Sequence, residues 1–384
     1  MGLSRRFLNL IAADYAIGAR LLLRIDLTRH QLFHPTQTPP AHGHGCGPAA
    51  GEGNAGIDQR MEGIRLPRPS FSFKAGISEA VELKWYIGCF PLADGKMLFT
   101  DSTLRAFLFD ANTRHVTAMP NLHKHKVRPA PLFVPGAGGV GGSLFLMEEY
   151  PKPEPRRRGQ LSHQFEAFVY RETSMTSPSS SGSWHHHLLP PPPYVHDPSY
   201  WNLRNKITSY AVLGGGSHIC ISVEGVGTYC MDTTSHEWYQ LGEWKLPFKG
   251  KVEYVPELKL WFGLSAETQR FAAADLSTMN SQSQPQLVGE WKELDLPEEW
   301  VDMQRTQIVN LGSGRFCIAR FMATTVTNGK ELGDVPIDRN FIVLTGVEVL
   351  PLVRNGNRED RKVELQMVSH KSRRINDIAT ETLF

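Results

Sequence analysis

Apolar and polar positions alternate along short stretches of this chain, in a unit that recurs. The clearest copy begins at Ser217–Val223, where Ile219, Ile221 and Val223 fall on one face. A period of two is the signature of a half-buried β-strand. The residues that follow predict, in order, a turn at Glu224–Gly227, a return strand at Thr228–Asp232, a turn at Thr233–His236 and a third strand from Glu237. The unit is therefore predicted to be a strand meander.

Further copies of this unit lie on both sides of the clearest one. In the next copy, Leu258, Leu260, Phe262 and Leu264 alternate with other residues before the run Arg270–Asp275. Earlier and later copies cover Lys96–Asp110, Leu144–Tyr170 and Arg315–Leu350, and Leu21–Phe33 looks like half of one. The spacing of the copies suits a four-stranded propeller blade of roughly 40–50 residues.

These repeats predict an all-β fold, a β-propeller of about six kelch-like four-stranded blades with disordered loop insertions. In each copy, an Asp followed by Thr, Ser or Asn should bind the backbone two or three residues further on and so form the turn. Packing within and between blades is the expected role of five tryptophans, Trp85, Trp238, Trp244, Trp261 and Trp291. A pair of β-sandwiches would show similar strands and stays open as the alternative.

Three segments interrupt the repeats and are predicted to be insertions. Residues 36–60 contain almost no large apolar side chains, which predicts a disordered loop. Residues 151–160 indicate a solvated insertion, and the Ser-rich and then Pro-rich residues 173–198 indicate a loop or a stiff extended spacer. The rest is expected to form a single β-propeller domain, residues 1–370, followed by a polar C-terminal tail, residues 371–384.

Composition and charge narrow the classes of function. The chain has 41 Lys and Arg against 39 Asp and Glu, a net charge of +2, so no overall field attracts nucleic acid or an acidic membrane. Asn9 and Asp14 interrupt the apolar stretch that a signal peptide would need, which favours a cytoplasmic or nuclear protein. A reducing compartment is also the simpler interpretation of five scattered cysteines, Cys46, Cys89, Cys220, Cys230 and Cys317, which are too few for a disulfide framework.

Motifs of known catalytic sites are missing from the sequence. It contains no Gly-x-Ser-x-Gly, no His-Glu-x-x-His and no Cys-x-x-Cys. The glycine-rich Gly136–Gly142 leads into a predicted strand and not into a helix, so a hairpin turn is expected in place of a phosphate-binding loop. Two pairs of adjacent carboxylates, Glu148 with Glu149 and Glu298 with Glu299, are expected to be solvated, because neighbours on a strand face opposite ways. No catalytic residue is predicted.

Histidines and basic residues offer the remaining candidates for chemistry. Three consecutive histidines, His185–His187, cannot all face one ion, and the group His42, His44 and Cys46 lies in the predicted disordered loop, so no metal site and no cofactor is expected. The densest basic run comprises His123, Lys124, His125, Lys126 and Arg128. We expect this run to be a solvated loop, with contact to an anion or an acidic peptide as the alternative.

Several short motifs resemble one family. They are Ser4–Leu10, Leu22–Leu27, Leu66-Pro67 with Pro69, the unit from Asp101 to Leu122, Lys126, and Pro129 with Pro131. On these motifs the chain resembles an uncharacterised plant family that is expanded in grasses and known as domain of unknown function 1668. The resemblance covers most of residues 4–350. It implies a kelch-like architecture and a plant origin, and it implies no catalytic residues.

Together these observations predict a non-catalytic scaffold that presents the loops of its blades to an unidentified protein partner. A repeat fold with loop insertions and no catalytic motif favours this function. The alternative is an enzyme of the kelch-propeller type, with an active site in the central channel built from residues far apart in sequence. Neither nucleic acid nor a membrane is an expected partner.

Overall fold

The computed structural model describes residues 5–34, 61–75, 86–92, 95–126, 128–136, 141–154, 161–172, 182–201, 205–325, 337–352, 364–376 and 379–384. Nearly all regular structure in these residues is β-strand. The exceptions are three short 3-10 helices, η4 (Pro193–His196), η5 (Pro198–Tyr200) and η6 (Gly214–Gly216). The chain forms two compact units: unit 1 comprises Met1–Ser72 and Lys292–Phe384, and unit 2 comprises Phe73–Trp291.

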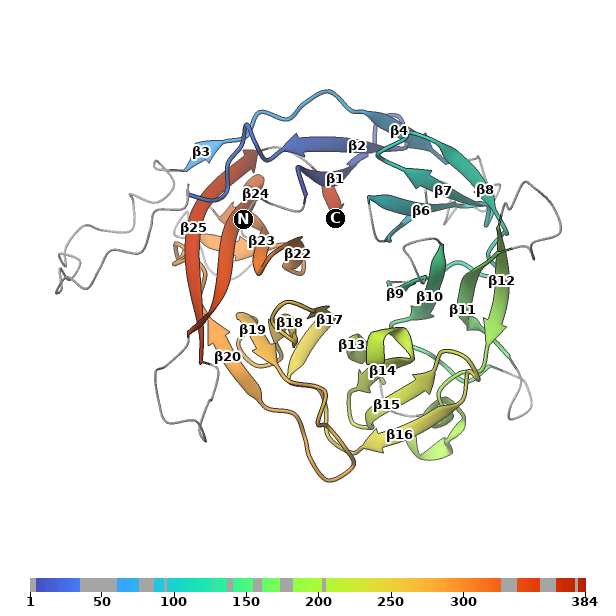
Figure 1. The fold of residues 1–384 in the computed structure, drawn as a ribbon. Coiled ribbons are helices and arrows are strands. Elements are labelled where there is room, and N and C mark those ends of the chain that lie inside the picture. Colours follow the sequence, from blue (N-terminus) through green and yellow to red (C-terminus); the bar gives the residue numbers. More distant parts are fainter. Residues whose placement is uncertain are drawn as a thin grey trace, which may run out of the picture. The chain divides into compact units, whose positions relative to one another are not determined.

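Unit 2 contains four meanders of four antiparallel strands each (Figure 1). The first is β5 (Ile87–Pro91), β6 (Lys96–Asp101), β7 (Ala106–Asp110) and β8 (Val116–Met119). The second is β9 (Pro129–Pro135), β10 (Gly142–Glu148), β11 (Ser162–Arg171) and β12 (Ser183–Leu189). The third is β13 (Ile207–Leu213), β14 (His218–Val223), β15 (Gly227–Asp232) and β16 (Trp238–Gly242). The fourth is β17 (Phe248–Val255), β18 (Leu260–Ser265), β19 (Phe271–Ala274) and β20 (Leu287–Trp291), and β17 pairs in parallel with β13.

Unit 1 contains two sheets, and one of them joins the two ends of the chain. That sheet has the order β26-β1-β2-β4, with β26 (Thr380–Leu383), β1 (Phe7–Asp14), β2 (Ala19–Asp26) and β4 (Phe71–Lys74). Leu10 of β1 lies opposite Leu383 of β26, so the first and last strands share a blade. The second sheet comprises β21 (Trp300–Asp302), β22 (Gln307–Gly312), β23 (Arg315–Thr325), β24 (Ile337–Leu352), β25 (Glu364–Asn376) and β3 (Glu62–Gly63).

Two sheets in unit 1 and four meanders in unit 2 make the fold a β-propeller, as the repeats predict. The aspartate turns between strands are confirmed as well. In each, the carboxylate accepts a hydrogen bond from the backbone N–H two residues further on: Asp26 from Thr28 (2.9 Å), Asp101 from Thr103 (2.9 Å), Asp110 from Asn112 (2.7 Å), Asp232 from Thr234 (2.8 Å) and Asp275 from Ser277 (2.8 Å). These local side-chain to backbone bonds are typical of Asp turns and close them.

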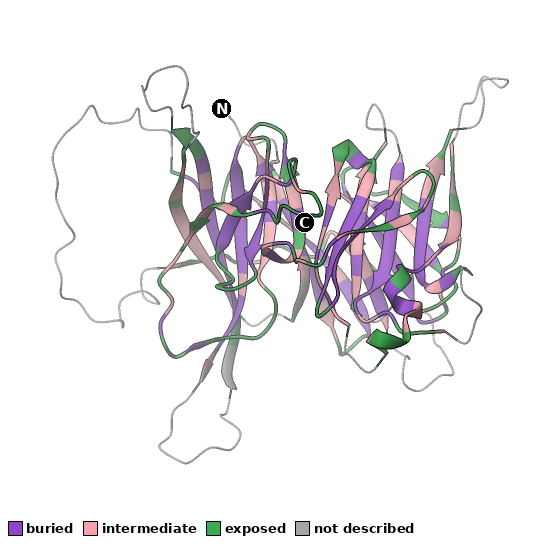
Figure 2. Ribbon diagram, turned by 90° about the horizontal axis from the view of Figure 1, so that it is seen from below, coloured by how far each residue is buried: buried purple, intermediate pink, exposed green. Residues whose placement is uncertain are grey.

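Apolar layers between neighbouring sheets form the core of each unit. In unit 2, Ile219, Ile221 and Val223 of β14 pack with Phe145 and Phe165 of the preceding meander, which confirms the predicted buried face of β14. In unit 1, one layer contains Leu8, Leu10, Ile25, Cys317, Phe321 and Ile342. Figure 2 shows that buried residues follow the strands, whereas exposed residues concentrate in the turns. Each blade therefore covers the apolar face of the next one within its unit.

Four of the five tryptophans expected to pack within or between blades do so in the structure. Trp238 packs against the layer between the second and third meanders, and its Nε1 donates a hydrogen bond to the carbonyl of Pro190 (3.0 Å). Trp261 and Trp244 pack in the layer between the third and fourth meanders, and Trp291 stacks near Phe271. Trp85 lies outside the described residues.

Two predicted non-regular segments contain strands instead. Within residues 173–198, Ser183–Leu189 forms β12, and η4 buries Tyr194 and Val195 in the apolar layer. The predicted polar tail is also regular, since β25 continues to Asn376 and β26 follows. The prediction failed at β12 because a strand whose middle is three histidines shows no apolar alternation. Residues 36–60 lie outside the described residues, as do residues 155–160 of the insertion at 151–160.

Cys220 and Cys230 are joined in a disulfide, which differs from the expectation of scattered, reduced thiols. They lie directly opposite each other on β14 and β15, and their Cα atoms are 4.2 Å apart. The nine residues between them form a hairpin, which the sequence predicts, but the register that aligns the two cysteines is set by the turn. Cys46 lies outside the described residues.

The apolar stretch that Asn9 and Asp14 interrupt forms strand β1. The described residues contain no helix with the length and apolar character that a membrane crossing needs.

Candidate functional site

A fully buried carboxylate, Glu166, is the centre of the candidate site. It lies on β11, where side chains alternate between two apolar layers. Phe165 and Ala167 belong to the layer against the third meander, whereas Phe168 belongs to the layer against the first meander. Glu166 shares the Phe168 face and lies opposite Leu146 of β10, which is also part of that layer. The strand thus places one carboxylate among apolar side chains, where an unpaired charge would be strongly destabilising.

Lys126 supplies the opposite charge. Its side chain is fully buried, and Nζ forms an ion pair with Glu166 Oε1. Nζ also donates hydrogen bonds to the backbone carbonyls of Lys124 (2.9 Å) and His163 (2.7 Å). Because an ammonium group has three hydrogens, these three acceptors satisfy it completely.

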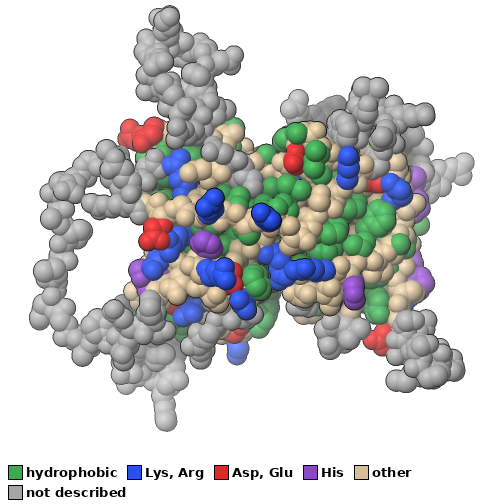
Figure 3. Space-filling model, turned by 90° about the horizontal axis from the view of Figure 1, so that it is seen from above, with side chains coloured by type: hydrophobic (Ala, Val, Ile, Leu, Met, Phe, Trp, Pro, Cys, Tyr) green, Lys and Arg blue, Asp and Glu red, His purple; other side chains and the backbone are tan. Residues whose placement is uncertain are grey.

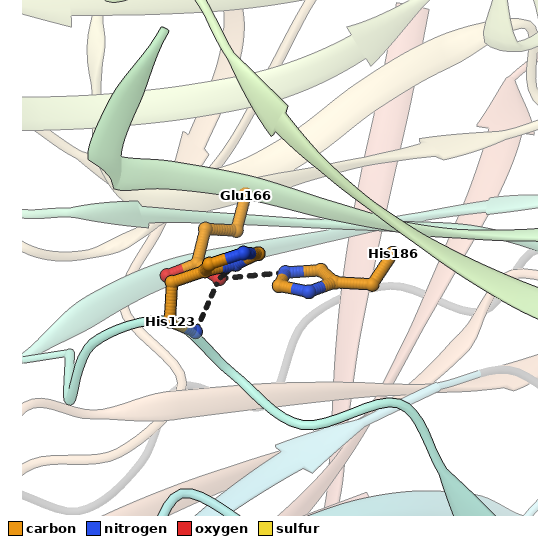
Figure 4. Close-up of side chains that lie close together, drawn as sticks. All are labelled: His123, Glu166 and His186. Carbon is orange, nitrogen blue, oxygen red and sulfur yellow. Dashed lines mark hydrogen bonds and ion pairs between the residues drawn. The ribbon is translucent and has the colours of Figure 1, made fainter.

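Two histidines approach the other oxygen of the same carboxylate (Figure 4). The backbone N–H of His123 donates to Glu166 Oε2 (2.9 Å), and its ring Nδ1 lies 3.3 Å from that oxygen. Nε2 of His186 lies 2.6 Å from Oε2, although its alignment is not that of a well-formed hydrogen bond. The two rings have centroids 4.5 Å apart, and Phe168 stacks on His186 at 4.8 Å. His123 remains 45% exposed, whereas the side chain of His186 is 6% exposed.

These contacts determine the charge of Glu166. Burial favours the neutral acid, but His186, Lys126 and the His123 N–H together outweigh burial and lower the pKa of Glu166 to about 2. The carboxylate is therefore ionised throughout the physiological range. A carboxylate with so low a pKa and so many donors around it is a poor general base.

The basic run that the sequence predicts to be a solvated loop is instead anchored by contacts of His123, Lys124, His125 and Lys126, whereas Arg128 is exposed as predicted. His125 Nε2 contacts the carbonyl of Ser102 (3.0 Å), and Lys124 Nζ forms an ion pair with Glu148 (3.2 Å). Glu148 and Glu149, which the sequence predicts to be solvated, are both buried. The prediction is wrong because each carboxylate meets a lysine from another part of the chain. Glu148 ends β10 and pairs with Lys124 of the connection from β8 to β9, whereas Glu149 follows β10 and pairs with Lys206 Nζ (3.8 Å), just before β13. Glu298 and Glu299 are exposed, as predicted.

The three consecutive histidines behave as alternation on a strand requires. Only His186 is directed at Glu166. His185 contacts Ser183 Oγ (3.0 Å) and His187 contacts Arg171 Nη2 (3.3 Å). The prediction that one ion cannot bind all three is consistent with this geometry. What sequence analysis missed is that the middle histidine meets His123 and Glu166, which are far away in the sequence.

The other candidate motifs are the glycine-rich segment and the group of two histidines and a cysteine near the N-terminus. Gly142 begins β10, so the glycine-rich segment leads into a strand as predicted, although residues 137–140 lie outside the described residues. His42, His44 and Cys46 also lie outside them.

Comparison with known proteins assigns the chain to a family. The family model described as "Protein of unknown function (DUF1668)" matches residues 5–375. The chain belongs to this family. This confirms the resemblance that the sequence motifs indicate. No curated protein matches the chain.

Solved structures of low similarity include other propellers. The β-propeller domain of Cps50 (Swd1) from Myceliophteria thermophila is 10% identical, with a TM-score of 0.29, and the match covers 67% of this chain and 92% of that one. Hsv2 from Kluyveromyces lactis is 10% identical, with a TM-score of 0.32 and coverage of 80% and 89%. Hydrazine synthase from Kuenenia stuttgartiensis is 9% identical, with a TM-score of 0.35 and coverage of 77% and 70%. At these scores none of them bears on the function of this family member.

Proposed function

We propose that this protein is a non-catalytic scaffold that binds a protein partner through loops of its blades. The observation that carries the proposal is the hairpin between β1 and β2. At its tip, Tyr15 is 76% exposed and Ile17 is 49% exposed. Large apolar side chains at the tip of a turn add nothing to the packing of the core, and contact with a partner is the role that suits them.

The hairpin tip is also held in one conformation. Asp14 Oδ1 accepts hydrogen bonds from the backbone N–H of Ala16 (3.1 Å) and of Ile17 (3.4 Å). A tip that is already ordered loses little conformational entropy on binding, which favours affinity. Tyrosine is among the residues enriched in interface hot spots. Tyr15 and Ile17 are therefore suited to insert into a pocket of a partner.

Two further features support binding over catalysis. The buried carboxylate Glu166 pairs with Lys126 and accepts the backbone N–H of His123, and its pKa is too low for a general base. In addition, hydrophobic side chains are exposed among basic and uncharged ones on the face shown in Figure 3, a mixture that suits a protein partner.

The test is quantitative affinity purification with the full chain and the double variant Tyr15→Ser/Ile17→Ser. The matched control is Tyr239→Ser, which removes a 45% exposed tyrosine from β16. We expect one or more proteins to be recovered with the wild type and the control but reduced at least about tenfold with the hairpin variant, as loss of a hot spot implies. If no recovered protein depends on the hairpin, the proposed surface is wrong.

A further inference from the structure

His123, Glu166 and His186 present their ligand atoms to a common point. His123 Nδ1, a carboxylate oxygen of Glu166 and His186 Nε2 all lie within 4.8 Å of one another. They come from three separate places in the chain: the connection between β8 and β9, strand β11 and strand β12 (Figure 4). We propose that these three residues form a binding site for a single Zn²⁺ ion.

The types of ligand select the metal. Two imidazoles and one carboxylate suit Zn²⁺ and neighbouring transition metals, whereas Mg²⁺ and Ca²⁺ prefer oxygen ligands throughout. Zinc binds histidine nitrogen and carboxylate oxygen at about 2.0–2.1 Å, so two ligands of a tetrahedral ion lie about 3.3 Å apart. The distance from His123 Nδ1 to Glu166 Oε2 is 3.3 Å. His186 Nε2 lies 2.6 Å from the same oxygen, so it has to move outward by about 0.7 Å to reach the spacing of two zinc ligands.

His186 provides an independent observation in favour of a ligand. Its side chain is more than nine-tenths buried, at 6% exposure, and Nε2 has no well-formed hydrogen bond. This buried nitrogen does contact Glu166 Oε2 at 2.6 Å, but without the alignment of a hydrogen bond. A metal ion between the rings would give this nitrogen a partner and would also relieve its short approach to Glu166.

The surroundings orient the ligands. Lys126 holds Oε1 of Glu166 by an ion pair, which leaves Oε2 to bind the metal through one oxygen. Phe168 stacks on the ring of His186 and limits its rotation. Such supporting contacts are typical of metal sites, where they fix the direction of each ligand. Because His123 is 45% exposed, the fourth position of the ion faces solvent and can be taken by water.

The expected consequence is a tie between segments that are distant in sequence. The ion would link the connection that precedes β9 to strands β11 and β12 of the same meander. Because metal binds the folded chain, Zn²⁺ should raise the melting temperature, and Mg²⁺ should not.

The test is isothermal titration of the full chain, freed of any polyhistidine tag and of bound metal, with ZnCl₂. The informative variant is His123→Ala, because its side chain is half exposed and the substitution keeps the backbone N–H that binds Glu166. The second variant is His186→Ala, and its matched control is His185→Ala, one residue away on the opposite face of β12. We expect one Zn²⁺ per wild-type chain, binding at least about tenfold weaker in both variants, and no change in the control.

Three outcomes would overturn the proposal. The first is the absence of saturable one-to-one binding to the wild type. The second is equal affinity of His123→Ala and the wild type, with circular dichroism showing that both are folded. The third is an equal loss of affinity in His185→Ala, because this would assign the metal to the exposed histidines of β12. The site does not involve the β1–β2 hairpin, so its failure leaves the proposed partner binding intact.

Discussion

The two faces of strand β11 are buried in different ways. On one face, Phe165 and Ala167 are covered by apolar side chains of the third meander. On the other face, Glu166 is buried just as deeply and forms an ion pair with Lys126. On the first face, Phe165 and Ala167 make only apolar packing contacts with the layer against the third meander. The second also packs, through Phe168, but adds an ion pair, two backbone acceptors and two histidines. The same strand therefore joins its two neighbours by different means.

This difference shows which face of β11 depends on particular side chains. An apolar layer accepts many combinations of side chains of suitable volume. A buried ion pair has no such freedom, because removing either partner leaves an uncompensated charge in the interior. The charged face of β11 should consequently be far more sensitive to single substitutions than the apolar face, and less sensitive to a matched double substitution.

The largest effect is expected for Lys126→Met. This substitution leaves Glu166 buried without its cation and should lower the free energy of unfolding by about 3–5 kcal/mol. Guanidinium chloride unfolding, followed by fluorescence, measures it. The double variant Lys126→Met/Glu166→Leu should regain most of the loss, because both charges are then gone. A loss below about 1 kcal/mol in the single variant would contradict the assigned role of the pair.

The pH dependence of stability should come next in size. Because the pKa of Glu166 is lowered from its ordinary value of 4.5 to about 2 in the folded chain, the stabilisation is complete above pH 4.5 and is lost as the pH falls toward 2. The expected loss is on the order of 3 kcal/mol. Urea unfolding at a series of pH values, compared with the double variant that lacks the carboxylate, measures it. Parallel curves for the two proteins would show that Glu166 does not contribute.

The apolar face offers a milder test in Ala167→Leu. Ala167 is fully buried, so three additional carbon atoms have to displace packed neighbours, and the free energy of unfolding should fall by about 1–3 kcal/mol. Chemical denaturation measures this as well, and Ala118→Leu on the exposed side of β8 is the control. If Ala167→Leu cost more than Lys126→Met, the contrast between the two faces of β11 would be reversed.

Local patterns account for the part of this structure that the sequence predicts. Alternation identifies Ile219, Ile221 and Val223 as one buried face, and each aspartate turn is closed by residues two positions apart. Both signals lie within a few neighbouring residues. The propeller follows from their repetition along the chain.

The candidate site has no such local signal. Lys126 and Glu166 are brought together only by the pairing of β9, β10 and β11, and His186 joins them only because β12 follows in register. Lysine and glutamate are more often solvated than buried, so sequence analysis placed Lys126 in a solvated loop and singled out no role for Glu166. The one usable hint was the density of basic residues in a connection next to a strand that ends in two glutamates.

The smallest effect separates the two roles that His123 could have. Its side chain is half exposed, and the hydrogen bond that it contributes to Glu166 comes from the backbone, so His123→Ala should change the free energy of unfolding by about 0.5 kcal/mol or less when a chelator is present. With Zn²⁺ in excess, the wild type should become more stable than the variant, because metal binding adds to the stability of the folded chain alone. A large loss of unfolding free energy in the presence of the chelator would mean that the imidazole itself stabilises the charged face of β11. His123 would then belong, with Lys126 and Glu166, to the polar contacts that distinguish this face from the apolar one.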